Sequence, residues 1–239
     1  MAFDVVPWTK HPLADFLMRK THANGLEYHS GIHIQSGYNF FNQSAIGYDQ
    51  ELDIAWAGHD IIYDNKPYKE RRSADYVVSL IDELGYNYLD TDLIWNLIMA
   101  TEKHEIDEEL EEKDLAYYII AADLNDLAYP DRVLTNFELI KKESMRLYGI
   151  SDTQFAQANL DFMQGLHNRL YGQLLTKKHT DGISKTMELA RKILNNNEAE
   201  TWKKNDIINQ VEVLWNKSDA EMRAKILQRI LLDGQANIS

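Results

Sequence analysis

The chain has 239 residues, 44% of them hydrophobic, which is enough for one substantial core or for a core with a small appended element. It has no cysteine, which excludes disulfides, thiolate zinc sites, iron–sulfur clusters and a cysteine nucleophile, so any metal must be held by His, Asp or Glu. The 38 acidic and 25 basic residues give a net charge of −13, which repels nucleic-acid backbones and argues against long DNA or RNA as a partner.

The start of the chain has neither the basic region nor the apolar run of a signal peptide. No uninterrupted apolar stretch approaches the ~20 residues that a membrane span needs. We therefore predict a cytoplasmic protein without membrane contact. A small anion can still bind an acidic protein where a metal or a local basic cluster reverses the field.

Apolar residues recur at helical spacing along most of the chain, and sustained alternation with a period of two is absent, which predicts an all-α fold of about ten helices. Two capping-box motifs, SDTQ at Ser151 and SDAE at Ser218, predict the starts of two of them. Four other helices are predicted from apolar stripes, which in chain order comprise Leu52, Ala55, Trp56 and His59; Ala74, Val77, Val78 and Ile81; Ile94, Leu97, Ile98 and Thr101; and Leu115, Tyr118, Ile119 and Ala122.

Turn-forming and charged residues in the segment KKHTDG, Lys177 to Gly182, predict a break after a long helix. The predicted organisation is a core at residues 1–180 followed by a C-terminal helical extension at residues 181–239. The amphipathic pattern around Trp215 requires burial, either on the core or on a second subunit. The sequence therefore allows a homo-oligomer that forms through these last helices.

The segment LDIAWAGHDIIYD places His59 on the apolar stripe of its predicted helix and Asp60 about 100° further round. Taken alone, such a pair is more often a buried histidine bonded to a carbonyl, beside an exposed aspartate. However, His29 and His33 lie upstream at i and i+4 of a predicted helix start, and Asp123 lies downstream in an apolar helix, where a carboxylate needs a cation or a strong donor. Two imidazoles and two carboxylates that point inward suit a hard or borderline divalent ion.

The order His, His-Asp, Asp in the contexts YHSGIHI, GHDIIYD and AADLNDL resembles the HD-domain superfamily of metal-dependent phosphohydrolases, most closely its branch of small predicted phosphohydrolases. The resemblance runs from about Tyr28 to about Leu194 and includes KERRSADYV, ATEKH and ELARKIL. It implies an HD-type helical core and a divalent metal ion, which could be Mn, Mg, Co, Ni, Fe or Zn. The implied metal ligands are His33, His59, Asp60 and Asp123. The residues that would line or brace the pocket are His29, Asp64, Glu70, His104 and Asp126.

Three positions depart from the pattern of this branch. Ala121 replaces a carboxylate, Lys69 replaces an asparagine, and a Gly-Arg pair appears as Ala158 and Asn159. All four implied metal ligands are present. The departures therefore concern the substrate more than the metal, and they leave a nucleotide-binding sensor without turnover as an alternative.

Hydrolysis of a phosphate ester needs a metal and an acid or base near the attacking water. Asp64 is the first candidate for this base, because a helix would place it on the face of Asp60, four residues earlier; the alternative is an acidic helix end or a cap for the segment NKPY. Glu70 is the second candidate. In the basic run KPYKERR, Lys69 and Arg72 are the candidates to hold phosphate groups.

His104 shares a predicted helix face with Leu97, so it can point inward and bind phosphate or help to hold a second metal. Di-iron oxygenases also occur among HD-fold proteins, but they generally need additional histidines, and only His29 and His104 are available here. We therefore predict a phosphohydrolase acting on a small, anionic, phosphorylated metabolite, with a nucleotide as the first candidate. Asp64, Glu70 and His104 are assigned to catalysis, and the substrate-binding residues are His29, Lys69, Arg72 and Asp126.

Overall fold

The structure is a computed structural model that describes residues 11–44, 46–106, 110–129, 132–170 and 175–195. Over these ranges the chain forms nine α-helices, one short 3₁₀-helix and no β-strand, which confirms the predicted all-α fold. The helices are α1 (Pro12–Ala23), α2 (Gly31–Gln43), α3 (Gln50–Gly58), α4 (Lys69–Leu84), α5 (Thr91–Lys103), α6 (Lys113–Asp123), η1 (Asn125–Ala128), α7 (Val133–Tyr148), α8 (Asp152–Leu170) and α9 (Lys177–Leu194).

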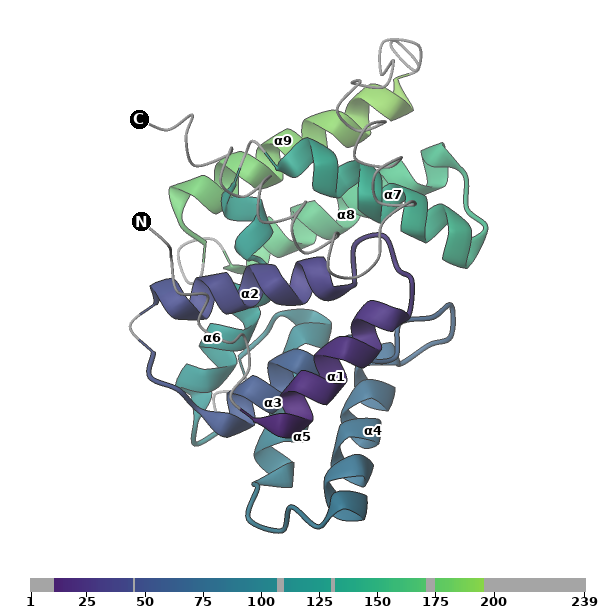
Figure 1. Ribbon diagram of the computed structural model, residues 1–239. Helices are drawn as coiled ribbons and strands as arrows, with labels where there is room; N and C mark the ends of the chain where they lie inside the picture. Colours follow the sequence, from purple (N-terminus) through teal and green to yellow (C-terminus); the bar gives the residue numbers. More distant parts are fainter. Residues whose placement is uncertain (1–10, 45, 107–109, 130–131, 171–174, 196–239) are drawn as a thin grey trace, which may run out of the picture.

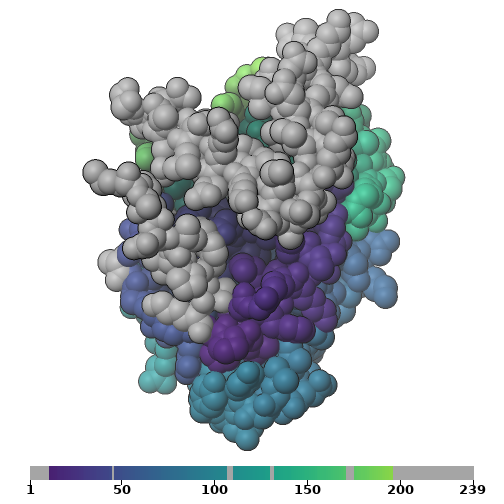
Figure 2. All heavy atoms as spheres, viewed as in Figure 1, coloured from purple at the N-terminus to yellow at the C-terminus, as the bar shows by residue number. Residues whose placement is uncertain are grey.

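Helix α2 crosses the middle of the molecule and separates two groups of helices (Figure 1). Helices α1, α3, α4 and α5 lie on one side of it, and α7, α8 and α9 lie on the other. The space-filling view shows α1 on the surface of this face, above the turn that joins α4 and α5 (Figure 2). Among the described helices, none is both long and apolar enough to span a membrane.

The predicted apolar stripes form the main core. Every member of the four stripes is buried except Val78, Leu115 and Tyr118, which are half-buried. A second, smaller core lies between α7, α8 and α9 and includes Phe137 and Phe155.

Side-chain caps define several helix ends. The capping box predicted at Ser151 is confirmed, because the Ser151 amide donates to Gln154 Oε1 (2.9 Å) and the Gln154 amide donates to Ser151 Oγ (3.2 Å). The Asp49 carboxylate accepts from the Leu52 amide at the start of α3. The second predicted capping box, at Ser218, lies outside the described residues.

Helices α2 and α3 approach each other closely at Gly37. A Cβ atom at this position would lie 2.0 Å from the indole of Trp56, so only glycine fits. Trp56 Nε1 donates a hydrogen bond to the carbonyl oxygen of Ile34 (2.9 Å), which locks the two helices together. His33 is one turn before Gly37, and His59 directly follows α3. The close approach therefore sets the distance between these two imidazoles.

The break predicted at Lys177 to Gly182 is wrong, because this segment is the first part of α9. Its polar residues begin a helix: His179 Nδ1 accepts a hydrogen bond from the Thr176 amide (3.3 Å) as part of a capping box. Gly182 is buried, and a Cβ there would lie 1.9 Å from the carbonyl oxygen of Leu127. The proposed domain limit at residue 180 thus falls inside a core helix. Residues 196–239 lie outside the described residues, so the C-terminal extension stays a prediction.

Candidate metal centre

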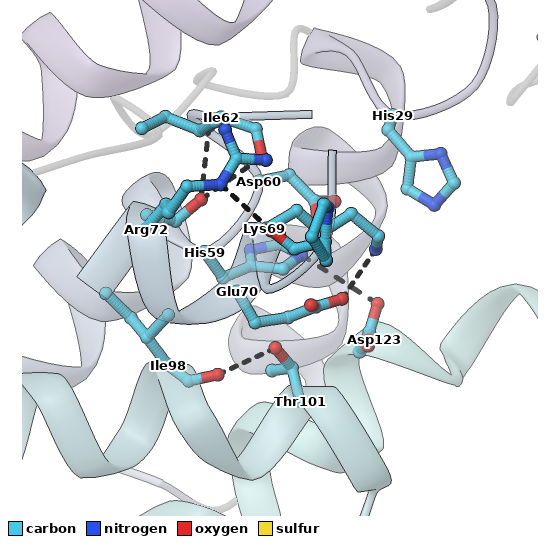
Figure 3. A network of polar contacts seen from close by, with 12 residues as sticks. His29, His59, Asp60, Ile62, Lys69, Glu70, Arg72, Ile98, Thr101 and Asp123 are labelled. Atoms are coloured by element: carbon cyan, nitrogen blue, oxygen red, sulfur yellow. Dashed lines mark hydrogen bonds and ion pairs between the residues drawn. The ribbon is translucent and has the colours of Figure 1, made fainter. Parts of the chain in front are cut away.

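Four of the predicted site residues come together in the interior, from α2, from the end of α3 and from the end of α6. His33 Nε2 lies 2.9 Å from Asp123 Oδ1, and His59 Nε2 lies 3.0 Å from Asp60 Oδ2. The Nε2 atoms of His33 and His59 are 3.3 Å apart. His33, His59 and Asp60 offer ligand atoms that all lie within 4.8 Å of one another, so this buried group can hold a metal ion. Figure 3 shows His59, Asp60 and Asp123 at the centre of the polar network.

The His-Asp pair follows the last turn of α3 instead of continuing it. The helix ends at Gly58, where a Cβ atom would lie 2.6 Å from the Val77 side chain, and His59 is the C-cap residue. The His59 ring stacks on Trp56, with ring centres 4.4 Å apart, and its Nδ1 donates to the Trp56 carbonyl oxygen (2.7 Å). A carbonyl can only accept, so Nδ1 carries the proton and the lone pair of the neutral ring is on Nε2. This is the arrangement that orients a histidine towards a metal.

The charges of the cluster are strongly coupled. Burial lowers the pKa of His59, but the Asp60 carboxylate outweighs burial and raises this pKa to about 9. Burial raises the pKa of Asp60, but His59 and then His29 lower it well below its usual range. For Asp123, burial is likewise outweighed by hydrogen bonds from His104 and His33, which lower the pKa of this carboxyl. Both carboxylates are therefore ionised, and they attract a cation.

The donor set fits a divalent metal ion. Asp60 Oδ2 is buried and makes no hydrogen bond of regular geometry to the described residues, although it lies at ion-pair distance from His59 Nε2 (3.0 Å) and His33 Nε2 (3.8 Å). A buried carboxylate oxygen that faces two imidazole nitrogens can share a cation with them. Two nitrogen and two oxygen donors suit a hard or borderline divalent ion such as Mn, Fe, Co, Ni or Zn.

His104 lies beside Asp123 on the side away from His33. Its Nε2 is 2.9 Å from Asp123 Oδ2, whereas Asp123 Oδ1 faces His33. His104 caps α5 in a left-handed conformation (φ 54°), which turns its ring towards the end of α6. The described part of the chain contains no second group of three or more such ligands. In this structure His104 contacts the candidate ligand Asp123, and it belongs to no second group of ligands among the described residues.

Asp126, which was predicted to bind substrate, has both carboxylate oxygens occupied. Tyr28 donates its hydroxyl proton to Oδ2 (3.0 Å), and Ser36 Oγ donates to Oδ1 (2.6 Å). Asp126 is buried and belongs to η1, whereas Ser36 belongs to α2. These bonds connect the helix of His33 with the segment that follows Asp123, so Asp126 braces the site.

Asp64 does not share a helix face with Asp60, and this prediction is wrong. Because α3 ends at Gly58, Asp64 lies in the loop before α4, where its Oδ1 accepts from the Lys66 amide (2.9 Å). Its two oxygens also pair with the Arg72 guanidinium at 3.0 and 2.5 Å. The hydrogen bond with Arg72 lowers the pKa of Asp64 to about 2, which leaves a poor base. Asp64 and Arg72 thus form a partly exposed pair that stabilises the loop.

Lys69 and Glu70 begin α4 and extend towards the cluster (Figure 3). The preceding residue, Tyr68, has a left-handed conformation (φ 60°), and the helix starts directly after it. Lys69 Nζ is 2.5 Å from Glu70 Oε1 and lies over the Tyr63 ring, 4.1 Å from its centre. Burial lowers the pKa of Lys69, but Asp60 and Glu70 outweigh burial and raise it, so the amine is charged.

His29 is not part of α2, in contrast to the prediction, because the helix begins at Gly31 with Ser30 as its N-cap. Its Nδ1 instead makes a short contact with Glu143 of α7. Sequence reasoning missed Glu143, although it follows Phe137 and Ile140 at a spacing of three and so occupies an apolar position. It is only 1% exposed. The same argument that singled out Asp123 therefore applies to it.

A cavity adjoins Asp123 on the side of the α7–α9 group. It is lined by Tyr28, Asp123, Asp126, Leu127, Val133, Asn136, Phe137, Ile140, Asn159, Met163 and Thr186. The Oδ1 atom of Asn159 is buried and has no hydrogen-bond partner among the described residues. One of the positions at which the sequence departs from the family pattern thus lies next to the candidate site.

Comparisons of the chain with protein-family models, with curated proteins and with solved structures give no significant match. The resemblance to the HD-domain superfamily therefore rests on the sequence motifs alone.

Proposed function

We propose that the protein is a metal-dependent phosphohydrolase that cleaves a phosphate ester or anhydride bond of a small phosphorylated metabolite, with a nucleotide as the first candidate. One observation supports this proposal most strongly. His33, His59, Asp60 and Asp123 converge from three separate segments, and a buried oxygen of Asp60 faces the Nε2 atoms of His59 (3.0 Å) and His33 (3.8 Å). Such a set of ligands serves a cation, and phosphate-ester hydrolysis is a common use of a divalent cation.

These four residues would hold the ion, and the ion would polarise a phosphoryl oxygen and lower the pKa of a bound water. Other residues support this arrangement. His104 fixes one oxygen of Asp123, so the other oxygen faces the cluster. The charged Lys69 amine lies close enough to Asp60 for the Asp60 carboxylate to raise its pKa, which suits an ammonium that binds phosphate.

Glu70 replaces Asp64 as the candidate proton acceptor. The Asp64 carboxylate is engaged by Arg72 and by the Lys66 amide, and it lies in the loop before α4. The Glu70 side chain extends towards the cluster, and its Oε1 pairs with Lys69 Nζ. A carboxylate in this position can accept a proton from the attacking water.

Two other functions use the same residues. A di-iron oxygenase needs a second iron, and the described residues contain no second group of ligands, so this function has less support. A nucleotide sensor without turnover would bind the same anion. The sensor is suggested by Ala121, which occupies a position where the family pattern has a carboxylate.

The deciding experiment combines metal analysis with a substrate screen. The protein is loaded with Mn²⁺, Mg²⁺, Co²⁺ or Fe²⁺ and incubated with nucleoside mono-, di- and triphosphates and cyclic nucleotides, and released phosphate and pyrophosphate are measured. We expect the metal-loaded protein to release one of these products and Asp60→Asn to release none. Asp64→Asn is the matched control and retains activity. Binding without release would indicate a sensor, and oxygen consumption by the iron-loaded protein would indicate an oxygenase.

A further inference from the structure

We propose that the cavity beside Asp123 binds the leaving-group end of the substrate, and that it selects a short group with an N–H or O–H donor. Asp123 belongs both to the candidate metal centre and to the lining of this cavity. The inference rests on the proposed function where it treats the bound group as part of a substrate. Binding of such a group to the cavity does not itself require hydrolysis.

The cavity is small and has an apolar wall. Helix α7 contributes Val133, Phe137 and Ile140, which follow one another at the spacing of a helix face. Helix α8 contributes Met163. The volume of about 40 Å³ has room for about three water molecules or for a ligand group of about four non-hydrogen atoms. A whole nucleobase is too large for this space, so only one end or one edge of a larger ligand enters.

Asn159 of α8 lines the cavity with an amide whose oxygen has no partner. Its Oδ1 atom is buried and accepts no hydrogen bond from the described residues. A buried polar atom without a partner costs free energy, and a leucine of similar shape would avoid this cost. The χ2 torsion of asparagine is broad, so the amide can turn its oxygen towards a ligand in the cavity. Packing of the helices alone therefore does not account for an asparagine at this position.

The charges around the cavity favour a donor over an anion. Asp123 and Asp126 both line it, and the described lining residues include no lysine, arginine or histidine. Both carboxylates already have hydrogen-bond or ion-pair partners, so they act on a ligand mainly through their charge. Two negative charges repel a phosphate or carboxylate group and attract the positive end of an N–H or O–H bond. We therefore expect the donor end of the ligand to enter the cavity and the phosphate to stay outside it.

Water is the competing occupant of this cavity. A water molecule can also donate to Asn159 Oδ1, but it gains nothing from contact with the apolar wall. A ligand group that combines a donor with a short apolar chain uses both features. The property that distinguishes the two occupants is therefore a measurable preference for such a group.

The first test measures the binding of small probes to the full-length protein in the presence of Mg²⁺ by nuclear magnetic resonance. 1-Propanol, n-propylamine, acetone and acetate have the same number of non-hydrogen atoms, but only the first two carry a donor. We expect these two to shift the side-chain NH₂ signals of Asn159 and to bind at least about tenfold more tightly than the others. The stronger binder of the two shows whether the natural group is neutral or cationic. Equal affinities for all four probes, or unshifted Asn159 signals, would overturn the inference and leave water as the occupant.

Variants separate the hydrogen bond from the space. Asn159→Leu should weaken 1-propanol binding by about tenfold, keep acetone binding within about twofold, and melt at the same or a higher temperature than the wild type. Asn168→Leu is the matched control, because it is the same exchange at an exposed position of the same helix. Val133→Ile narrows the cavity, so it should weaken both probes, and it decides the question if Asn159→Leu does not fold. Unchanged 1-propanol binding in Asn159→Leu and in Val133→Ile would overturn the inference.

The second test connects the cavity with hydrolysis. 3-Hydroxypropyl phosphate and n-butyl phosphate have the same chain length and differ in the donor at its end. We expect kcat/KM of the metal-loaded wild type to be at least about tenfold higher for the hydroxypropyl ester, and this ratio to fall to about one in Asn159→Leu. A ratio of about one in the wild type would overturn the assignment of the cavity to the leaving group. Probes that bind at Asn159 in a protein that cleaves no ester would support the cavity as a binding site and overturn the proposed function.

Discussion

The Nε2 atoms of His33 and His59 face each other at 3.3 Å, although the two residues are 26 positions apart in the sequence. In the neutral form of His59, Nε2 bears a lone pair, because Nδ1 donates to the Trp56 carbonyl. A proton or a metal ion between the rings removes the repulsion of two lone pairs. The contact therefore links metal binding, protonation and stability, and the first three predictions test these links.

Exchange of one carboxylate should remove the metal while the fold persists. Asp60→Asn eliminates a buried negative charge beside both imidazoles, so we expect metal affinity to fall by about a hundredfold or more, with unchanged helical circular dichroism. Asp64→Asn should keep its metal and about its full activity, because Asp64 pairs with Arg72 on the surface. Elemental analysis after dialysis measures both. Full metal occupancy in Asp60→Asn would remove this residue from the ligand set.

Chelation should lower the melting temperature. Without a cation, the buried carboxylates of Asp60 and Asp123 depend on the histidines alone. An ion that binds only the folded state stabilises it by about 2.7 kcal/mol when its free concentration is a hundred times Kd. Differential scanning calorimetry with a chelator, and then with excess Mn²⁺, measures this effect. Asp60→Asn is the control, and it should melt at the same temperature in both conditions.

Metal-free protein should lose stability as the pH rises. The folded state raises the pKa of His59 to about 9, whereas an unperturbed histidine titrates at about 6.5. The folded state thus binds this proton more tightly than the unfolded state does. The resulting stabilisation is complete below about pH 6.5 and is lost as the pH approaches 9. Thermal unfolding with chelator across this range should show a decline that is weaker in Asp60→Asn. Equal declines would contradict the assignment.

His104 should tune metal affinity through Asp123. His104→Asn removes the contact with Asp123 Oδ2, and asparagine tolerates the left-handed backbone at this position. We expect metal affinity to fall by about 10-fold to 100-fold. Tyr68→Asn is the matched control, since Tyr68 is the other non-glycine residue with a positive φ among those described. Metal titrations that give equal affinities for both variants would exclude a bracing role for His104.

Glu70→Gln should separate proton transfer from metal binding. The exchange keeps size and hydrogen-bonding capacity but removes basicity, so turnover of the best substrate should fall by about a hundredfold at constant metal content. Glu83→Gln, at an exposed position of the same helix, is the control. Steady-state kinetics and elemental analysis on the same samples measure both quantities. Wild-type turnover in Glu70→Gln would place the proton acceptor elsewhere.

The helices and the clustering of His33, His59, Asp60 and Asp123 could be predicted because the signal for each is local. Apolar residues at helical spacing indicate which face is buried, and a carboxylate at such a position, as at Asp123, indicates a polar partner. The end of α3 could not be predicted in this way, because the apolar pattern continues through His59. Tertiary contacts end the helix: Gly58 packs on Val77, and the Ile62 amide donates to Ser73 Oγ (3.1 Å). Asp64 was misplaced for this reason.

The break predicted at Lys177 to Gly182 was wrong for the opposite reason. Its composition is typical of a turn, but a capping box and a close contact with η1 begin a helix there. Both depend on the partner that the segment meets in space. Glu143 is a different case. The sequence shows that it occupies an apolar position of its helix, but only the structure shows that its partner is His29.

The close contact between Gly37 and Trp56 restricts how the candidate metal centre can change by stepwise substitution. Any side chain at position 37 would collide with the indole, so Trp56 would have to become smaller first. A smaller residue at position 56 would remove the ring on which His59 stacks and the bond that joins α3 to the Ile34 carbonyl. Each single change thus passes through a variant with a displaced imidazole. Gly37 has no reactive group, but the helix packing that it permits limits which substitutions the site can accept.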